Sequence, residues 1–375
     1  MNTKLLYLLD LTHPELMGLV NSFGEPAYRA DQLLKWIYKK LACSYDDMTD
    51  LPQPLREKLA STVALLTLQP VDERSSADEQ TRKTLFRLDD GKTIESTFML
   101  YGETGSSRER RTVCVSSQVG CVMGCPFCAT GQQGFERNLR PGEIIEQVLY
   151  FVRTNAKSQG APEPLRRPIT NVVFMGMGEP LANYENVWRA VTMLNSEKGL
   201  CLGARQLTIS TAGLLPQITR LAAEKLHVEL AISLHSAKDD VRNRLVPVNK
   251  KYPLSRLIPA CRDYFQKTGR RITFEYALFR EINDSAEDAS KLASMLARLN
   301  CHVNLIAGNP TAFTGFKPSS AKQVRAFQKQ LTAGNISNTI RQSKGVDIEA
   351  GCGQLRSRWL AKELSSCPPA SQGSG

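Results

Sequence analysis

Three cysteines of this 375-residue chain stand close together, at Cys121, Cys125 and Cys128. One tight loop could aim all three thiolates at a single metal centre, because thiolates are soft ligands that suit iron–sulfur clusters and zinc. A structural zinc site is closed by four ligands, and only Cys114 is a local fourth candidate. Three cysteines on a four-iron cluster would leave one iron open to a substrate or cofactor. The spacing therefore favours an open cluster, with structural zinc as the alternative.

The other cysteines are less clustered. Cys352 stands between two glycines, which suits an exposed thiol on a flexible loop that could act as a nucleophile. Cys114, two residues inside an expected strand, could equally be a core thiol. We expect no catalytic role for the five scattered cysteines, which are Cys43, Cys201, Cys261, Cys301 and Cys367.

The composition, 42% hydrophobic and 23% charged, is that of a folded protein and excludes disorder. Lys and Arg total 48 against 37 Asp and Glu, a net charge of +11 that favours a polyanionic partner. No apolar run approaches the roughly 18 residues of a membrane helix, and we find no secretory signal. We therefore expect a cytoplasmic protein with no membrane partner, where structural disulfides are disfavoured.

Hydrophobic periodicity divides the chain into parts. Apolar periods at 15–20, 29–38 and 54–65 predict a small helical domain over residues 1–65. Alternating residues around Asp89-Asp90-Gly91 predict a β-hairpin within a β-rich connector, residues 66–105. Residues 106–345 then repeat strand and helix, and residues 346–375 form a C-terminal segment with a disordered tail from Ser365. Strands are expected at 112–116, 171–175, 206–210, 228–234, 271–278 and 302–306, and helices at 141–154, 184–194, 215–224, 254–268 and 286–298.

Six strand–helix units predict an α/β fold with a parallel sheet, either a partial (β/α) barrel or an open doubly wound sheet. Polar and glycine-rich residues follow the expected strands at 176–180, 210–211, 233–235 and 308–310. In either architecture these segments would meet at one ligand site. The stretch Gly176-Met177-Gly178-Glu179-Pro180 fails as a dinucleotide fingerprint, because Leu181 replaces the third glycine. A tight turn whose carboxylate accepts hydrogen bonds from an ammonium group is the better interpretation.

The Cys-x3-Cys-x2-Cys spacing after the first strand of a β/α array resembles the radical S-adenosylmethionine (SAM) superfamily. The resemblance implies a partial (β/α)6 barrel and a [4Fe-4S] cluster held by Cys121, Cys125 and Cys128. The open iron would chelate SAM, and the reduced cluster would cleave it to a radical. The residues implied in SAM binding are Gly178, Glu179, Ser210, Ser233, Leu234, His235 and Asn309.

The likeness is closer to the RlmN/Cfr family of RNA adenine methyltransferases. It rests on CVSSQVGC (114–121), GFERNL (134–139), GMGEP (176–180), LVPVN (245–249), HVNLI (302–306) and AGCGQL (350–355). The helical start, through YRADQ (28–32) and DMTDLP (47–52), resembles the RlmN branch and implies an RNA-binding accessory domain.

This resemblance implies a two-SAM route, in which Cys352 first receives a methyl group by displacement. A radical from a second SAM then removes hydrogen from that methyl group, and the methylene carbon adds to adenine. Glu95 aligns with the proton acceptor, although the strand alone would make it a solvated residue. Cys114 aligns with the cysteine that resolves the adduct through a transient disulfide with Cys352.

The implied product is 2-methyladenosine in 23S rRNA and in tRNA. A Cfr-like enzyme that methylates C8 of the same rRNA adenosine is the nearest rival, and a non-catalytic zinc and RNA-binding protein is a rival of another class. We expect a monomer served by an electron donor such as flavodoxin or ferredoxin. Candidate phosphate contacts are Arg108, Arg110, Arg111, Arg137, Arg140, Arg270, Arg271, Arg356 and Arg358.

Overall fold

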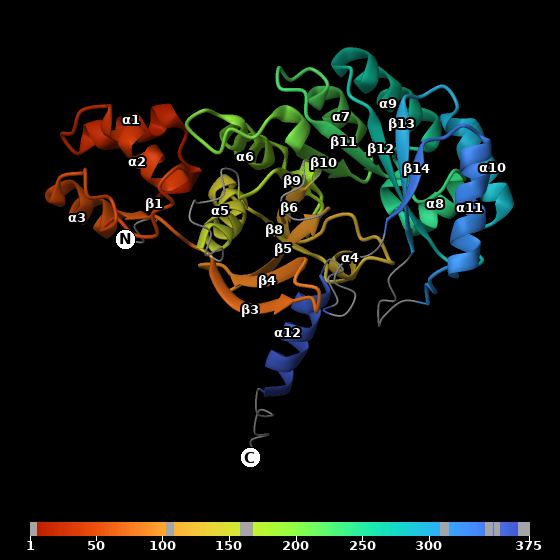
Figure 1. The fold of residues 1–375 in the computed structure, drawn as a ribbon, viewed down its shortest axis with the longest axis horizontal. Helices are drawn as coiled ribbons and strands as arrows, with labels where there is room; N and C mark the ends of the chain where they lie inside the picture. Colours follow the sequence, from red (N-terminus) through yellow and green to blue (C-terminus); the bar gives the residue numbers. More distant parts are fainter. Residues whose placement is uncertain are drawn as a thin grey trace, which may run out of the picture.

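The computed structural model describes residues 6–102, 109–157, 168–307, 315–341, 348 and 353–366. Its centre is a ten-stranded sheet in the order β14-β13-β12-β11-β10-β9-β6-β5-β4-β3 (Figure 1). In that order the strands are β14 (Asn338–Arg341), β13 (Cys301–Ala307), β12 (Ile272–Leu278), β11 (Glu229–Ser233), β10 (Leu207–Thr211), β9 (Asn171–Phe174), β6 (Arg110–Cys114), β5 (Thr93–Tyr101), β4 (Thr81–Arg87) and β3 (Gln69–Ser75).

Within this sheet all neighbouring strands are parallel along the run β6, β9, β10, β11, β12, β13 and β14. A doubly wound sheet reverses its strand order at a switch point, whereas this order never reverses. The sheet is therefore a partial barrel, as expected. The prediction of six parallel strands was wrong by one, because β14 was missed. Three of its four residues are polar, so it carries no apolar run for periodicity to detect.

The remaining strands form an antiparallel extension. β4 and β5 make the predicted hairpin around Gly91, whose φ of +80° suits glycine in a tight turn. β5 then pairs with β6, so that the hairpin belongs to the same sheet as the barrel. Because the hairpin and barrel are continuous, side chains on β4 and β5 lie close to the end of β6.

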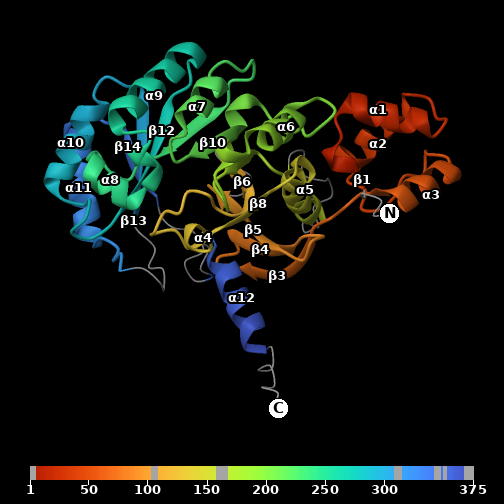
Figure 2. The ribbon, with the colours of Figure 1, turned by 180° about the vertical axis from the view of Figure 1, so that it is seen from behind.

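Helices cover the outer face of the curved sheet (Figure 2). They are α5 (Pro141–Lys157), α6 (Tyr184–Asn195), α7 (Leu215–Leu221), α9 (Leu254–Thr268), α10 (Ala286–Leu296) and α11 (Ala321–Ala333). The first five agree with the predicted helices to within a few residues, because each has one apolar face. α11 and the short α8 (Asp239–Leu245) were not predicted. None of the helices in the described ranges is long and apolar enough to cross a membrane.

Three further helices begin the chain, α1 (His13–Ser22), α2 (Arg29–Tyr38) and α3 (Gln53–Thr62), with a two-stranded sheet of β1 (Leu6–Tyr7) and β2 (Val63–Ala64). Their apolar side chains belong to the same hydrophobic core as the barrel. The Arg153 side chain on α5 donates to the carbonyls of Leu41 and Ala42, at 3.3 and 3.1 Å. The helices are therefore fastened to the barrel through α5.

The last helix, α12 (Gln354–Ser366), lies apart from the barrel helices and projects beyond β4 and β5 (Figures 1 and 2). The expectation of disorder from Ser365 onward is wrong at its start, since Ser365 and Ser366 end this helix. A short hairpin of β7 (Gln118–Gly120) and β8 (Phe135–Asn138) encloses the cysteine loop and α4 (Ala129–Gln132).

Gln147 on α5 fixes the chain where it leaves β6 toward the cysteines. Its side chain is fully buried, accepts from the Ser116 N–H at 2.7 Å and donates to the Ser116 carbonyl at 3.1 Å. These two bonds replace the strand partner that the backbone loses at the end of the sheet. The helix thereby sets the direction in which the cysteine loop starts.

Replacing Gln147 with leucine should lower the free energy of unfolding by about 3 kcal/mol, because two buried backbone groups lose their partners. Urea denaturation of the purified protein measures the change. The control Gln53→Leu removes an exposed glutamine on α3 and should cost less than about 0.5 kcal/mol. Equal effects of the two substitutions would contradict the assigned role of Gln147.

Candidate active site

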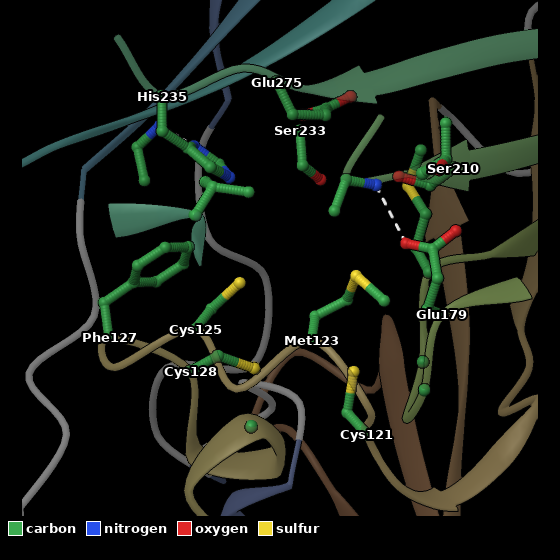
Figure 3. Close-up of a pocket in the computed structure, with 18 of the residues that line it drawn as sticks. Cys121, Met123, Cys125, Phe127, Cys128, Glu179, Ser210, Ser233, His235 and Glu275 are labelled. Carbon is green, nitrogen blue, oxygen red and sulfur yellow. Dashed lines mark hydrogen bonds between the residues drawn. The ribbon is translucent and has the colours of Figure 1, made fainter. Parts of the chain in front are cut away.

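A cavity of about 340 Å³ lies at the carboxyl ends of the parallel strands (Figure 3). This volume lies within the range of about 300–1,000 Å³ that is usual for small-molecule sites. Eight of the predicted residues line the cavity: Cys121, Cys125, Cys128, Gly178, Glu179, Ser210, Ser233 and His235. They come from four separate segments of the chain, so the fold does bring the strand ends together at one site.

The cysteine loop is held by close backbone contacts. Gly120 has a φ of +73°, and a Cβ on it would lie 1.9 Å from the Gly134 carbonyl oxygen. The Cys121 N–H donates to that same oxygen at 2.8 Å. Only glycine permits this approach of the two hairpin strands, which carries Cys121 to the cavity.

The thiols of Cys121, Cys125 and Cys128 all line this one cavity. Thiolates are soft ligands that suit an iron–sulfur cluster and also zinc. Three thiolates on a four-iron cluster would leave one iron open to a ligand in the same cavity.

Burial raises the pKa of the Cys121 thiol to about 12 and also raises the pKa of Cys125. Thiols in such surroundings remain protonated unless a positive group compensates the charge of the thiolate. A bound metal centre supplies that charge and releases the protons on binding.

The glycine-rich turn after β9 passes very close to the end of β6. A Cβ on Gly176 would lie 2.6 Å from the Val115 carbonyl oxygen, and one on Gly178, at a φ of +100°, would lie 2.5 Å from the Gln118 side chain. Both positions therefore require glycine. This close approach places the following residue, Glu179, beside the cysteine loop.

Glu179 is a buried carboxylate that already accepts two backbone hydrogen bonds. Its oxygens accept from the N–H groups of Ala212 at 2.8 Å and Leu181 at 3.1 Å. Burial nevertheless raises its pKa to about 7. A cationic ligand group in the cavity would offset this burial, which agrees with the ammonium partner expected from the sequence.

Ser210 and Ser233 stand at the ends of neighbouring strands, with His235 just beyond. His235 accepts from the Ala277 N–H at its Nδ1, at 3.0 Å, which leaves a proton on Nε2. Burial and the nearby Arg242 guanidinium lower the pKa of His235 to about 3, so the ring stays neutral. Leu234 differs from the others, because its side chain is buried in the core and does not line the cavity.

Arg242, which fixes these strand ends, was not predicted. Its fully buried guanidinium donates to the carbonyls of Ala212 at 2.7 Å, Ser233 at 3.2 Å and Leu234 at 3.0 Å. It also donates to Asn249 Oδ1 at 2.6 Å. Burial lowers the pKa of Arg242 to about 10. The signal was present in LVPVN (245–249), because its asparagine is one of the partners of Arg242.

Glu275 and Arg341 also line the cavity and were not predicted. Glu275 is 5% exposed, and its Oε1 accepts from Asn304 at 2.8 Å. Its Oε2 has no hydrogen-bond partner and lies 3.9 Å from Arg341 Nη1. Glu275 is the charged residue within an otherwise largely apolar strand, and this pattern could have marked it as a candidate site residue. An orphaned buried oxygen, a buried carboxylate and three thiols together fit a SAM-sized polar ligand beside a cluster.

Two predicted residues, Asn309 and Cys352, lie outside the described residues, and the other two, Glu95 and Cys114, do not line the cavity. Cys114 is buried at the end of β6, opposite Thr97 of β5. Glu95 lies two residues before Thr97, so both side chains point to the same face of the sheet. No disulfide bond joins cysteines within the described part of the chain.

Glu95 is not the solvated residue that the strand pattern suggested, since it is 3% exposed. It lies beneath the start of α12, where its oxygens accept from the N–H groups of Gly353, at 2.9 Å, and Arg356. Gly353 is buried against the cysteine loop, and a Cβ on it would lie 2.5 Å from Thr130 Oγ1. The flexible loop expected on both sides of Cys352 is therefore wrong for the residue that follows it.

The Arg356 side chain continues this docking. It donates to Thr93 at 3.2 Å, to Gln133 at 2.5 Å and to Glu136. The amide of Gln133 donates in turn to the Gly353 carbonyl at 3.1 Å. The chain neighbour of Cys352, the hairpin strand of Glu95 and the end of the cysteine loop thus form one hydrogen-bonded network.

Several arginines expected to contact phosphate form internal ion pairs instead. Arg137 pairs with Asp90 and Glu143, at 2.6 and 2.9 Å, and Arg140 pairs with Asp10 at 3.0 Å. Arg111 and Arg356 pair with Glu109 and Glu136. Arg110 and Arg271 are exposed, and their contact with phosphate stays a prediction. The net charge of the sequence therefore includes arginines whose charge is balanced by carboxylates of the protein itself.

Comparison with known proteins agrees with this geometry. Residues 6–65 match the family described as ribosomal RNA large subunit methyltransferase N-terminal domain, and residues 115–293 match the radical SAM superfamily. The crystal structure of a radical SAM methyltransferase from Sphaerobacter thermophilus superposes with a TM-score of 0.87 at 48% identity, covering 93% of this chain and 98% of that one.

Two curated proteins are similar over nearly their whole length. The "Probable dual-specificity RNA methyltransferase RlmN" of Moorella thermoacetica is 44% identical over 349 residues, which cover 93% of this chain and 96% of that protein. The "Probable dual-specificity RNA methyltransferase RlmN 3" of Opitutus terrae is 46% identical over 348 residues, with 92% of each chain covered.

Replacing Gly120 with alanine should displace the cysteine loop and reduce its capacity for iron, because the new Cβ collides with a backbone oxygen. We expect the wild-type chain to hold about four irons after anaerobic reconstitution and the variant to hold clearly fewer. The control Gly124→Ala has a similar positive φ, +62°, but open space around its Cβ. If both variants lose iron equally, backbone strain and not the close approach explains the loss.

Proposed function

Because the chain belongs to the RlmN family of radical SAM RNA methyltransferases, we propose that it forms 2-methyladenosine in 23S rRNA and in tRNA. The docking of α12 supports this proposal best, since it brings the chain neighbour of Cys352 against Glu95 and the cysteine loop. Glu95 and Gly353 are 258 positions apart in the sequence, so the tertiary fold is what brings them together.

The cavity would hold a [4Fe-4S] cluster on Cys121, Cys125 and Cys128, with SAM between the cluster and the strand ends. When bound, these groups supply a methyl group and a radical that removes hydrogen. Glu179 would accept hydrogen bonds from the SAM ammonium, and the serines and His235 would bind the nucleoside together with Gly178, Leu234 and Asn309. Reduction of the cluster requires an electron donor such as flavodoxin or ferredoxin.

Cys352 would carry the methyl carbon to the RNA. Its thiol would lose a proton as it takes the methyl group, and the same carbon would later bond to adenine. Glu95 would accept the proton displaced from the ring carbon, and the unpaired electron of the adduct would return to the redox system that supplied it. The Cys114 thiolate would then attack the Cys352 sulfur, so that an S–S bond forms as the bond between that sulfur and the transferred carbon breaks. The electron pair of the broken bond would stay with the carbon, which takes up a proton and becomes the methyl group.

The residue positions support this division of roles. Glu95 and Cys114 point to the same face of the sheet from adjacent strands, and α12 covers that face. Residues 1–65 would serve as an RNA-binding accessory domain, in a cytoplasmic enzyme that acts as a monomer. The target adenine must leave its stack to reach the site.

The product is tested with unmodified 23S rRNA and tRNA, SAM and a reductant. Mass analysis of the digested nucleosides should give 2-methyladenosine from both RNAs. Formation of 8-methyladenosine without the 2-isomer would instead assign the chain to the Cfr-like activity. Absence of any methylated adenosine from reconstituted protein would contradict the proposal itself.

Replacing Cys352 with alanine should abolish RNA methylation, because the carbon carrier is gone. Reductive cleavage of SAM, measured as 5′-deoxyadenosine, should persist, since the cluster and cavity remain intact. The control Cys201→Ala changes an exposed cysteine that does not line the cavity and should leave both activities unchanged. Retained methylation by Cys352→Ala would refute the carrier role.

A further inference from the structure

Lys83 is a buried charged residue for which neither the sequence nor the proposed mechanism provides a role. It lies on β4 opposite Thr97 of β5, and Thr97 in turn lies opposite Cys114 of β6. Since residues directly opposite each other share a face, Lys83, Glu95 and Cys114 point to one face of three adjacent strands. Phe86 and Phe98 point to the other face, where they contact Tyr150 and Phe151 of α5.

Lys83 and Glu95 form an ion pair away from water. Lys83 Nζ lies 2.6 Å from Glu95 Oε2, and the two side chains are 1% and 4% exposed. Desolvating two charges is costly, and such a pair often contributes little net stability. A buried pair beside a candidate site therefore calls for a role other than stabilising the fold.

The carboxylate of this ion pair also accepts hydrogen bonds from the N-terminus of α12. Both oxygens of Glu95 accept backbone N–H groups there, from Gly353 and from Arg356. The unpaired N–H groups at a helix start favour a negative charge, and a carboxylate accepts hydrogen bonds more strongly when ionised. The ammonium of Lys83 occupies one side of Oε2 and so fixes the direction in which the carboxylate faces.

We propose that Lys83 is a positioning residue that holds Glu95 as an oriented carboxylate, so that Glu95 docks the helix following Cys352. The proposal rests on the proposed function only where it links the docking of α12 to the reaction of Cys352. The ion pair, the helix contact and their consequence for α12 stand without it.

A coupling follows for the reaction. When Glu95 accepts the ring proton, the charged acceptor beneath α12 is lost. The docking weakens at that step. Helix α12 is thus held while the carbon is transferred, and it is loosened at the step in which Cys114 attacks the Cys352 sulfur.

Other charged groups around Glu95 are already engaged. Arg356 of α12 turns its guanidinium to Glu136 on β8, and Glu136 also pairs with Lys92 of the hairpin turn. Cys114 on β6 is the titratable neighbour on the opposite strand. Lys83 is the cation in direct contact with the Glu95 carboxylate among the ion pairs of the described residues.

Hydrogen exchange of the peptide that spans residues 353–360 tests the docking without any catalytic assay. In Lys83→Met the amides should exchange about tenfold faster than in the wild type, because the cap is weakened. Lys83→Arg keeps the charge and should restore most of the protection. The matched control Arg74→Met removes a half-exposed cation opposite Lys83, paired with Asp72, and should change nothing.

A double-variant cycle separates positioning from general stability. Glu95→Gln, a mimic of the protonated acid, should speed exchange of the same peptide, and adding Lys83→Met to it should have no further effect. The double variant should also fold more stably than Lys83→Met alone, which leaves a buried carboxylate without its cation. If Lys83→Met folds poorly, the double variant and Lys83→Arg still decide the question.

Product formation supplies the link to function. Lys83→Met should form methylated adenosine about 100-fold more slowly, as expected when a reacting group is misplaced, and Lys83→Arg should recover most of the rate. Wild-type exchange in Lys83→Met, or additive effects in the Glu95→Gln background, would overturn the inference. Failure of the wild type to carry a methyl group on Cys352, measured by intact mass, would overturn the proposed function and leave the exchange result standing.

Discussion

The site depends on a carboxylate buried under the start of a helix. Glu95 lies on a strand that forms early in the chain, and α12 is contributed by the last described residues. The contact costs desolvation of a charge, which Lys83 and two backbone N–H groups offset. Through Gly353 and Arg356 the same contact also reaches Gln133 at the end of the cysteine loop.

A second constraint acts at the strand ends. Backbone carbonyls at the ends of parallel strands have no partner in the sheet, and here the Arg242 guanidinium binds three of them. A hydrophobic residue at this position could not replace the arginine, because the carbonyls would then be buried without hydrogen bonds. The serines and His235 are thereby held at the cavity wall.

Features that depend on the local sequence were predicted, whereas features that depend on distant segments were not. Helix α9 and strand β12 were predicted almost to the residue, because apolar periodicity is a local property of the chain. β14 was missed because it is short and polar and gains its partners only from β13. The strand pattern taken alone placed Glu95 in solvent, and the arginines at 137 and 140 were expected to contact RNA phosphates. Both expectations were wrong because burial and ion pairing depend on distant segments of the chain.

The sequence by itself determined the chemistry that the chain can perform. Residues a few positions apart must lie close together in any fold. The sequence alone therefore brings Cys121, Cys125 and Cys128 onto one loop and places Glu179 after a glycine-rich turn. Only the tertiary structure decided which residues work together across long separations. Strand register placed Lys83, Glu95 and Cys114 on one face, and the fold then covered that face with α12. Such pairings depend on which strands become neighbours, and no local pattern encodes that choice.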